Sequence, residues 1–206
     1  MKTKPITNQY LQSASKLLAE AFYNNPAHEY ICPDSAKRLN QLKWLLGANL
    51  KLQLQNGAKS FCLFDSGKVI AMGYWTNPNN KIGLYKKVGA GLLLAPVKLG
   101  LKEFRRMMSV SHYIEKSISN LNLNEPHWYL NNMVVDEESR GKGLGTKILN
   151  QEIQKIKERQ PNAVFSLTTQ KIQNVEFYKK HGFEVVHEEN EKSHASDFSN
   201  WIMCKY

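Results

Sequence analysis

The chain has 206 residues, a length that suits one domain with a large core better than two independent units. Hydrophobic residues make up 42% of it and aromatic residues 10%, which excludes the polar, aromatic-poor composition of disordered chains. Lysine plus arginine outnumber acids by 28 to 18, and the net charge of +10 favours anionic partners such as nucleic acid, anionic lipid or a phosphorylated cofactor.

The cysteines and the apolar stretches indicate the compartment. Cys32, Cys62 and Cys204 are widely separated, with no histidine at metal-ligand spacing, so neither a disulfide framework nor a metal site is expected. The residues after Met1 are polar, unlike a signal peptide. The longest apolar stretch, residues 88–97, has about half the roughly 20 residues of a membrane-spanning helix and contains a proline. We expect a cytoplasmic protein without a membrane partner.

Two amphipathic helices and a hairpin are predicted in the first third. Thr7 can cap a helix with apolar residues at helical spacing over 11–22, and after a loop Asp34 can cap a second helix that ends near residue 56. Two runs of strand-forming residues, 60–64 and 68–75, flank Asp-Ser-Gly, which indicates a hairpin.

The rest of the chain is predicted to be a helical insertion followed by an alternating pattern. Residues 80–122 are basic and helical in character, although glycines and a proline interrupt them. Strand and helix patterns then alternate, which indicates a parallel strand pair, and two closing strands follow with a charged loop over 187–199 between them. The predicted ranges are strand 128–135, helix 143–159, strand 163–168, helix 174–181, and strands 183–186 and 200–204.

A turn with three alternating glycines joins a predicted strand to a predicted helix. It reads Arg-Gly-Lys-Gly-Leu-Gly-Thr over residues 140–146. Glycines leave amide groups unshielded and permit positive φ, so the amides can converge on an anion at a helix N-terminus. The dinucleotide pattern G-x-G-x-x-G fails at Thr146, and the P-loop pattern does not match. The alternative is a turn that only connects the two elements.

The spacing Arg140-x-x-Gly143-x-Gly145 after a strand resembles the pyrophosphate motif of the GNAT N-acetyltransferase superfamily. A second segment, 174–183, resembles the family's Asn-x-x-Phe/Tyr-Tyr…Gly-Phe element. The resemblance implies an α+β fold: a central, mostly antiparallel twisted sheet with a splayed parallel strand pair, flanked by helices. It implies one such domain over residues 1–206, with the insertion at about 80–122.

Shorter identities resemble the branch of that superfamily around puromycin N-acetyltransferase. They lie at residues 75–78, 125–130, 141–145 and 203–204. The predicted acceptor-binding first half is where such relatives differ, so puromycin itself is not implied.

The family resemblance implies acetyl-CoA as cosubstrate and assigns its contacts. Backbone groups at the end of the strand would bind the pantetheine arm, the glycine turn would bind the pyrophosphate, and two helical residues would lie beside the thioester. These residues are Met133, Val134 and Val135; Arg140, Gly141, Lys142, Gly143, Leu144, Gly145 and Thr146; and Asn174 and Phe177.

Tyr178 is the candidate general acid. When an amine displaces the thiolate a proton must reach sulfur, and a tyrosine with a pKa of about 10 is protonated at neutral pH. Without the motif, Tyr178 would be interpreted as a core aromatic residue. Relatives often have a carboxylate on the central strand, but Asn131 and Asn132 cannot accept a proton. The base stays open among His28, Glu29, Glu125 and His127.

Two other functions remain open from the sequence. A GNAT-like protein could bind acetyl-CoA without catalysis, and the basic insertion could bind nucleic acid, although no nucleic-acid motif accompanies it. A small-molecule amine is the expected acceptor, nucleic acid is not expected, and the protein is expected to be a monomer or homodimer. The basic residues are Lys86, Lys87, Lys98, Lys102, Arg105 and Arg106, and aromatic residues that could line an acceptor pocket or lie in the core are Tyr23, Tyr30, Trp44, Trp75 and Tyr85.

Overall fold

A computed structural model describes residues 3–77, 80, 82–121, 126–189 and 198–206. Six strands form one sheet in the order β1-β2-β3-β4-β6-β5. Every neighbouring pair is antiparallel except β3 and β4, which are parallel. The predicted mostly antiparallel sheet with one parallel pair is therefore confirmed. The strands are β1 (Lys59–Asp65), β2 (Lys68–Thr76), β3 (His127–Val135), β4 (Val164–Thr169), β5 (Glu184–Glu189) and β6 (Asn200–Lys205).

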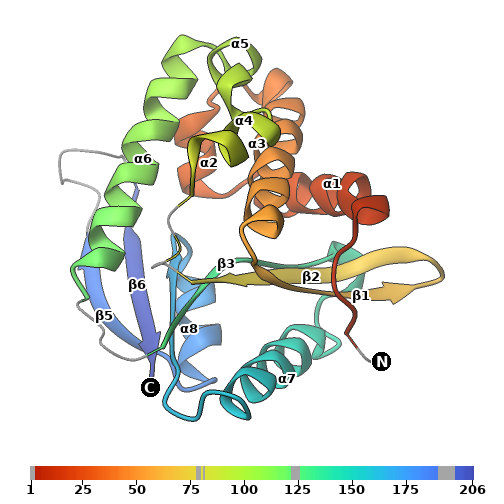
Figure 1. Cartoon of the computed structure of the whole chain (residues 1–206), viewed down its shortest axis with the longest axis vertical. Helices are drawn as coiled ribbons and strands as arrows, with labels where there is room; N and C mark the ends of the chain where they lie inside the picture. Colours follow the sequence, from red (N-terminus) through yellow and green to blue (C-terminus); the bar gives the residue numbers. More distant parts are fainter. Residues whose placement is uncertain (1–2, 78–79, 81, 122–125, 190–197) are drawn as a thin grey trace.

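Helices cover both faces of the sheet, as Figure 1 shows. The helices before β3 lie on one face and the two after it lie on the other. They are α1 (Leu11–Phe22), α2 (Pro26–Ile31), α3 (Ser35–Gln55), α4 (Leu84–Gly89), α5 (Ala95–Leu99) and α6 (Leu101–Ser119) on the first face, and α7 (Leu144–Lys157) and α8 (Ile172–Lys179) on the second. Short 3₁₀ turns lie at Asn8–Tyr10, Leu92–Leu94 and Glu137–Ser139.

Each face of the sheet has its own apolar core. On the first face, Leu18 of α1 and Leu42 of α3 pack with Met72 of β2, and all three are fully buried. On the second face, Leu149 of α7 and Phe165 of β4 are fully buried in a separate cluster. Since strand side chains alternate between faces, a sheet covered on both sides needs apolar residues at nearly every central position. β2 is buried at every residue after Lys68.

The hairpin is formed as predicted. Asp65 pairs with Lys68, and the two residues between them, Ser66 and Gly67, have φ of 48° and 81°. A two-residue turn with two positive φ values matches the twist of the flanking strands. The chain therefore reverses within two residues.

The N-terminal helices differ from the prediction in two places. Thr7 makes no side-chain cap bond and precedes a 3₁₀ turn, so the assignment of Thr7 as the helix cap is wrong. The segment predicted as a loop contains α2: the side chain of Asn25 accepts hydrogen bonds from the amides of Ala27 and His28, and Pro26 occupies the first turn. Asparagine before proline is a signal for the start of a helix. Helix α2 was not predicted because six residues are too few to show a helical period.

Candidate active site

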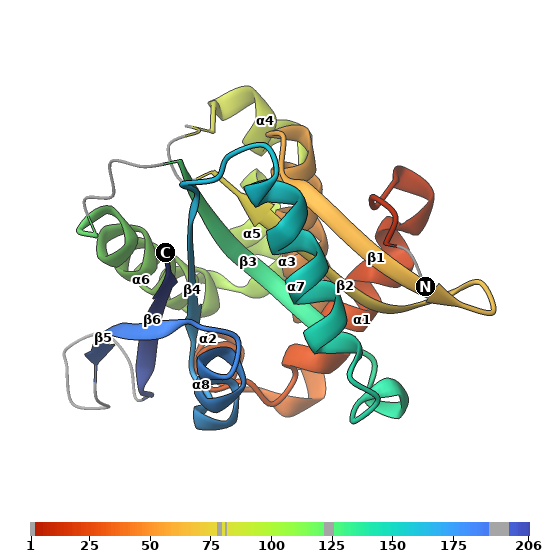
Figure 2. The same ribbon diagram turned by 90° about the horizontal axis from the view of Figure 1, so that it is seen from below.

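A fork between β3 and β4 is the central feature of the site. The two strands pair only over residues 127–130 and 164–167. β3 then continues to Val135 paired with β2 alone, and β4 continues to Thr169 paired with β6 alone. Figure 2 shows the strands side by side at one end and diverging toward the other. Beyond residue 130, the facing edges have no strand partner within the described chain.

Backbone groups of β3 point into this fork. The Asp136 amide donates to the Ile70 carbonyl of β2 over 2.7 Å. Because hydrogen-bonding directions alternate along an antiparallel strand, the groups of Met133 and Val135 point away from β2, and those of the residue between them point toward it. The Val135 carbonyl accordingly accepts from Arg140 Nε at 3.2 Å. A slot with exposed amide and carbonyl groups results.

A bulge places two asparagines beside the fork. The β2–β3 register shifts so that Tyr74 pairs with Asn132 and Asn131 has no partner on β2. The Tyr74 hydroxyl donates to Asn131 Oδ1 at 3.1 Å and accepts from Asn132 Nδ2 at 2.5 Å and from Asn49 Nδ2 at 3.2 Å. This cluster on the α1–α3 face is entirely uncharged.

Three buried tyrosines belong to β2, β3 and α8, the elements around the fork: Tyr74, Tyr129 and Tyr178. Tyr129 Oη and Thr168 Oγ1 lie 2.8 Å apart across the two strands. Burial raises the pKa of Tyr129 to about 12 and also raises the pKa values of Tyr74 and Tyr178. Tyr178 comes from α8 on the other face, where its ring packs against Phe177 and Phe183. All three are protonated at neutral pH.

The glycine turn follows β3 and begins α7. Gly141 and Gly143 have φ of 75° and 70°, and no protein atom lies within 4 Å of where a Cβ would stand on either. The first helical hydrogen bond runs from the Lys147 amide to the Gly143 carbonyl, so the amides of residues 144–146 have no helical partner. Such an open turn at a helix N-terminus can bind a phosphate group.

Helix α8 is fastened against this turn. An added Cβ on Gly145 would lie 3.5 Å from the Phe177 ring, so the glycine permits close packing. His181 Nδ1 donates to the Phe177 carbonyl at 2.7 Å, and its Nε2 accepts from Thr146 Oγ1 at 3.0 Å. Asn174 Nδ2 donates to Thr169 Oγ1 at 3.0 Å, at the end of β4. Phe177, Asn174 and Thr146 therefore gather around the fork and its turn.

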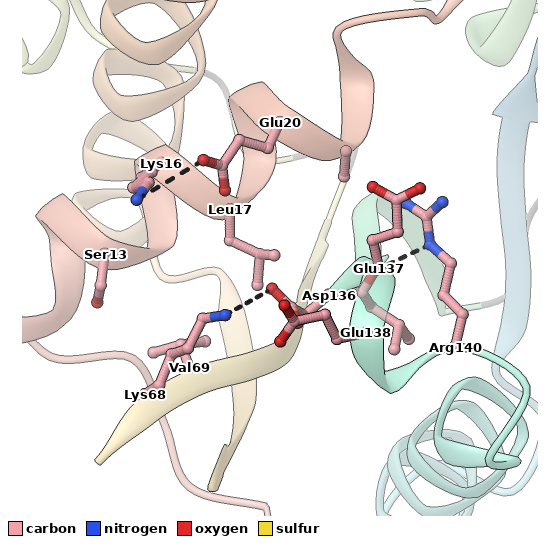
Figure 3. Close-up of a pocket in the computed structure, with 12 residues that line it drawn as sticks. Ser13, Lys16, Leu17, Glu20, Lys68, Val69, Asp136, Glu137, Glu138 and Arg140 are labelled. Carbon is pink, nitrogen blue, oxygen red and sulfur yellow. Dashed lines mark hydrogen bonds and ion pairs between the residues drawn. The ribbon is translucent and has the colours of Figure 1, made fainter. Parts of the chain in front are cut away.

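The connection from α1 to α2 crosses the fork on the opposite face. Leu17 and Ala21 of α1 line a cavity of about 750 Å³ together with Val135 at the end of β3 (Figure 3). At the other end of the connection, Asn25 Nδ2 donates to Gln170 Oε1 at 3.2 Å, directly after β4. Residues 21–25 thus extend from one arm of the fork to the other.

The cavity in Figure 3 is lined by both charge signs. Lys16 pairs with Glu20 at 3.7 Å, and Lys68 pairs with Asp136 at 3.1 Å. Arg140 extends along its edge. The acids on this wall are therefore partly neutralised by neighbouring lysines.

His28 has a defined tautomer beside this connection. Its Nδ1 lies 2.9 Å from Asn25 Oδ1, and because that oxygen only accepts, Nδ1 carries the hydrogen. The lone pair is then on Nε2. Removal from water lowers the pKa of His28 to about 4, so the ring is neutral at pH 7.

The other candidate bases are placed differently. His127 is buried where β3 and β4 are still paired, with Nε2 2.5 Å from Ser166 Oγ. Glu29 pairs with Arg38 at 2.9 Å. Glu125 lies outside the described residues. Among the described residues, no group of three or more His, Cys, Asp or Glu side chains could hold a metal ion.

The aromatic residues considered for an acceptor pocket do not gather in one place. Trp75 is fully buried against Phe165 on the second face, and Tyr85 on α4 is 75% exposed. Tyr23 donates to the Ser35 carbonyl, and the remaining two, Tyr30 and Trp44, pack toward α6 and α5. Sequence reasoning missed Tyr74 and Tyr129, whose alternation with apolar neighbours gives no signal beyond that of an ordinary strand.

A family model described as an acetyltransferase (GNAT) domain matches residues 105–199. This range contains the fork, the glycine turn and α8. No curated protein sequence matches the chain.

Solved structures share the fold over nearly the whole chain. A histone acetyltransferase HPA2 and related acetyltransferase from Corynebacterium glutamicum has 19% identity and a TM-score of 0.70, over 99% of this chain and 94% of that one. A polyamine N-acetyltransferase from Drosophila melanogaster has 11% identity and a TM-score of 0.64, over 100% of this chain and 99% of that one. An Arabidopsis thaliana protein in complex with the bisubstrate analogue CoA-Ac-MVNAL has 12% identity and a TM-score of 0.53, over 100% and 97%.

His127 predicts a loss of stability in mild acid. Burial lowers its pKa to about 4, below the roughly 6.5 of an unfolded chain, so the unfolded state binds the proton more readily. The contribution of neutral His127 to the free energy of unfolding is fully present above pH 6.5 and is lost as the pH falls from 6.5 toward 4. The free energy of unfolding, measured by urea denaturation, should therefore fall less between pH 7 and pH 5 in His127→Gln than in the wild type.

The exposed His112 provides the matched control for this prediction. His112→Gln should keep the wild-type difference between the two pH values. An unchanged difference in His127→Gln would show that His127 is not held neutral in the folded protein.

Proposed function

We propose that this protein transfers an acetyl group from acetyl-CoA to an amine. The observation that carries the proposal is the fork between β3 and β4, which ends at a glycine turn with free amides. A pantetheine arm has amide groups spaced along an extended chain, so it can take the place of a missing strand. The GNAT domain match over residues 105–199 supports the same function.

In this proposal the cofactor lies along β3 and ends on the glycine turn. Met133 and Val135 offer backbone hydrogen bonds to the pantetheine arm, with Val134 holding the strand between them against β2. Amides of Gly141, Lys142, Gly143, Leu144, Gly145 and Thr146, with the charge of Arg140, bind the pyrophosphate. Asn174 and Phe177 lie beside the arm, where Phe177 also supports the turn through Gly145.

Tyr178 supplies a proton to the leaving group. The amine nitrogen attacks the acetyl carbonyl carbon, the carbon–sulfur bond breaks, and the sulfur leaves with the electron pair. Burial raises the pKa of Tyr178, so the hydroxyl is protonated at neutral pH and able to donate to sulfur. Tyr178 follows Phe177, which packs beside Gly145 of the turn, and this position supports the proposed role.

The amine is expected to react in its neutral form. The side chains at the fork are uncharged, and His28, with a pKa of about 4, is too weak a base to deprotonate an alkylammonium with a pKa near 10. The nitrogen becomes far more acidic once bonded to the carbonyl carbon. We propose that Nε2 of His28, left free by the bond from Nδ1 to Asn25, accepts the proton at that stage.

A small amine is the proposed acceptor. The Drosophila melanogaster protein catalyses the formation of N-acetylagmatine, and agmatine is also the substrate named for another protein of this fold. The alternative is a GNAT-fold protein that binds acetyl-CoA without catalysis. Release of free thiol in the presence of an amine panel separates the two.

Several narrower expectations stay predictions. They are membership of the branch around puromycin N-acetyltransferase, one domain over residues 1–206 with an insertion at 80–122, a cytoplasmic location, no nucleic-acid partner, and a monomer or homodimer. No helix within the described ranges is long and apolar enough to cross a membrane.

A glutamate at Gly143 should abolish cofactor binding. It would place bulk and negative charge where the pyrophosphate lies, in space now free of protein atoms. We expect isothermal titration to show micromolar acetyl-CoA binding to the wild type and none to Gly143→Glu. Gly57→Glu is the matched control, because Gly57 also has positive φ and open surroundings but lies at the end of α3.

If Gly143→Glu and Gly57→Glu lost affinity for acetyl-CoA equally, the loss would come from backbone strain and not from the pyrophosphate site. Absence of binding to the wild type would remove the cofactor and every catalytic role assigned here.

Tyr178→Phe should slow turnover by about a hundredfold at saturating acetyl-CoA, since loss of a general acid costs about 10²–10⁴ in rate. Affinity for acetyl-CoA should be unchanged. The control Tyr206→Phe, which removes the hydroxyl group of an exposed tyrosine, should turn over as the wild type does. Wild-type turnover in Tyr178→Phe would exclude Tyr178 as the acid.

The pH dependence tests the neutral-amine proposal. For two acceptors whose pKa values differ, kcat/KM should rise with pH up to the pKa of each amine, because only the free base reacts. His28→Gln should lower kcat by about tenfold or more without moving either rise. A common rise for both amines that disappears in His28→Gln would instead make His28 the base that deprotonates the ammonium.

A further inference from the structure

The segment between β2 and β3 exposes an unusual number of large apolar side chains. Among the described residues, eight of the twelve exposed large hydrophobics lie within residues 84–108. Four of them, Leu84, Tyr85, Val97 and Leu101, are 66% to 82% exposed. The other four are Val88, Leu93, Leu94 and Met108. Exposed apolar residues scattered singly are ordinary, so their concentration in one segment calls for an explanation.

The same segment is strongly basic. Residues 84–108 contain six lysines and arginines and a single acid, a net charge of +5 out of the chain's +10. The acid is Glu103, which is half-buried and turned back toward Gly100 at the start of α6. Lys87, Lys98 and Lys102 are exposed among the apolar side chains. The exposed charge on this surface is therefore of one sign.

The segment is held to the body of the protein by its small and interior-facing residues. Ala95 and Leu99 of α5 are buried against Leu45 of α3, and Gln41 Nε2 of α3 donates to the Leu99 carbonyl at 2.7 Å. Figure 1 shows α4, α5 and the first turns of α6 at the end of the molecule opposite α7. The buried face of α5 consists of Ala95 and Leu99, whereas α4 has no buried residue, so the large apolar side chains of both helices lie outside the packed interface.

We propose that this surface, residues 84–108, binds the surface of an anionic lipid bilayer. Short helices with apolar residues and an excess of lysine and arginine are suited to the interface, where apolar side chains enter the acyl boundary and basic ones meet anionic headgroups. A second copy of this chain fits less well, because a symmetric contact would bring two surfaces of charge +5 together. Duplex DNA would leave the apolar side chains uncovered.

The prediction that no membrane partner exists rested on the lack of a spanning stretch. Binding to a bilayer surface needs no such stretch, so the two observations are compatible. The proposal is independent of acetyl transfer, since it involves none of the residues assigned to the fork.

The test is flotation of the purified full chain with lipid vesicles. We expect binding to vesicles of phosphatidylcholine mixed with phosphatidylglycerol, and little to phosphatidylcholine alone. Charge reversal at Lys98, in Lys98→Glu, should weaken binding by about tenfold or more, since each lysine near such a surface contributes about a fivefold factor. Arg159→Glu makes the same charge change at an exposed site just after α7 and should bind as the wild type does.

A second variant tests how much the apolar side chains contribute to vesicle binding. Val97 is 82% exposed, so Val97→Ser should leave the melting temperature unchanged while weakening vesicle binding. Val186→Ser, at a partly exposed position in β5, is the matched control. Failure of the wild type to bind anionic vesicles would overturn the proposal, and so would equal weakening in Lys98→Glu and Arg159→Glu.

Other occupants of the surface give distinct outcomes. A wild-type dimer in sedimentation that Val97→Ser converts to a monomer, without vesicle binding, would assign the surface to a second copy. Salt-sensitive binding to duplex DNA that Val97→Ser does not change would assign it to nucleic acid. Either result would overturn the bilayer proposal.

Discussion

The unfinished pairing of β3 and β4 is the constraint on which the rest of the site depends. A backbone amide or carbonyl left without a partner in a part-buried place costs about 1–3 kcal/mol. Apart from the Val135 carbonyl, which accepts from Arg140 Nε, the facing edges of β3 beyond residue 130 and of β4 beyond residue 167 have no such partner in the described chain. They are therefore stable only with water or with a ligand that carries amide groups at strand spacing, which is what makes the fork a slot.

Elements on both faces keep the fork open. The bulge at Asn131 turns β3 away from β4 while Tyr74 and Asn49 occupy its polar groups. On one face the α1–α2 connection extends from Val135 to Gln170. On the other, His181 ties α8 to the start of α7. These contacts come from both faces of the sheet, so the surroundings of the fork depend on the whole fold and not on β3 and β4 alone.

Charge is divided between the two ends of the slot. Arg140 and the free amides of residues 144–146 lie at the glycine turn, with acids and lysines in the cavity beside it, while the hydrogen-bonding groups at the fork are tyrosine, threonine and asparagine. A dianionic pyrophosphate and a neutral amine would each meet a suitable environment. The same separation explains why no strong base is expected at the site of the proposed reaction, and why the acceptor's own pKa should set the pH dependence.

The sequence by itself determined the features that depend on interactions between residues close together in the chain. The Asp-Ser-Gly hairpin, the parallel pair and the glycine turn at Gly143 were predictable, because turn chemistry and hydrophobic periodicity act over a few residues. Only the tertiary structure decided where β3 and β4 part, because strand pairing joins residues 37 positions apart in register and a bulge has no signature in composition. It likewise decided that Asn25 and Gln170 meet and that His28 has a free Nε2, since both follow from helix α2, which is too short to show a period.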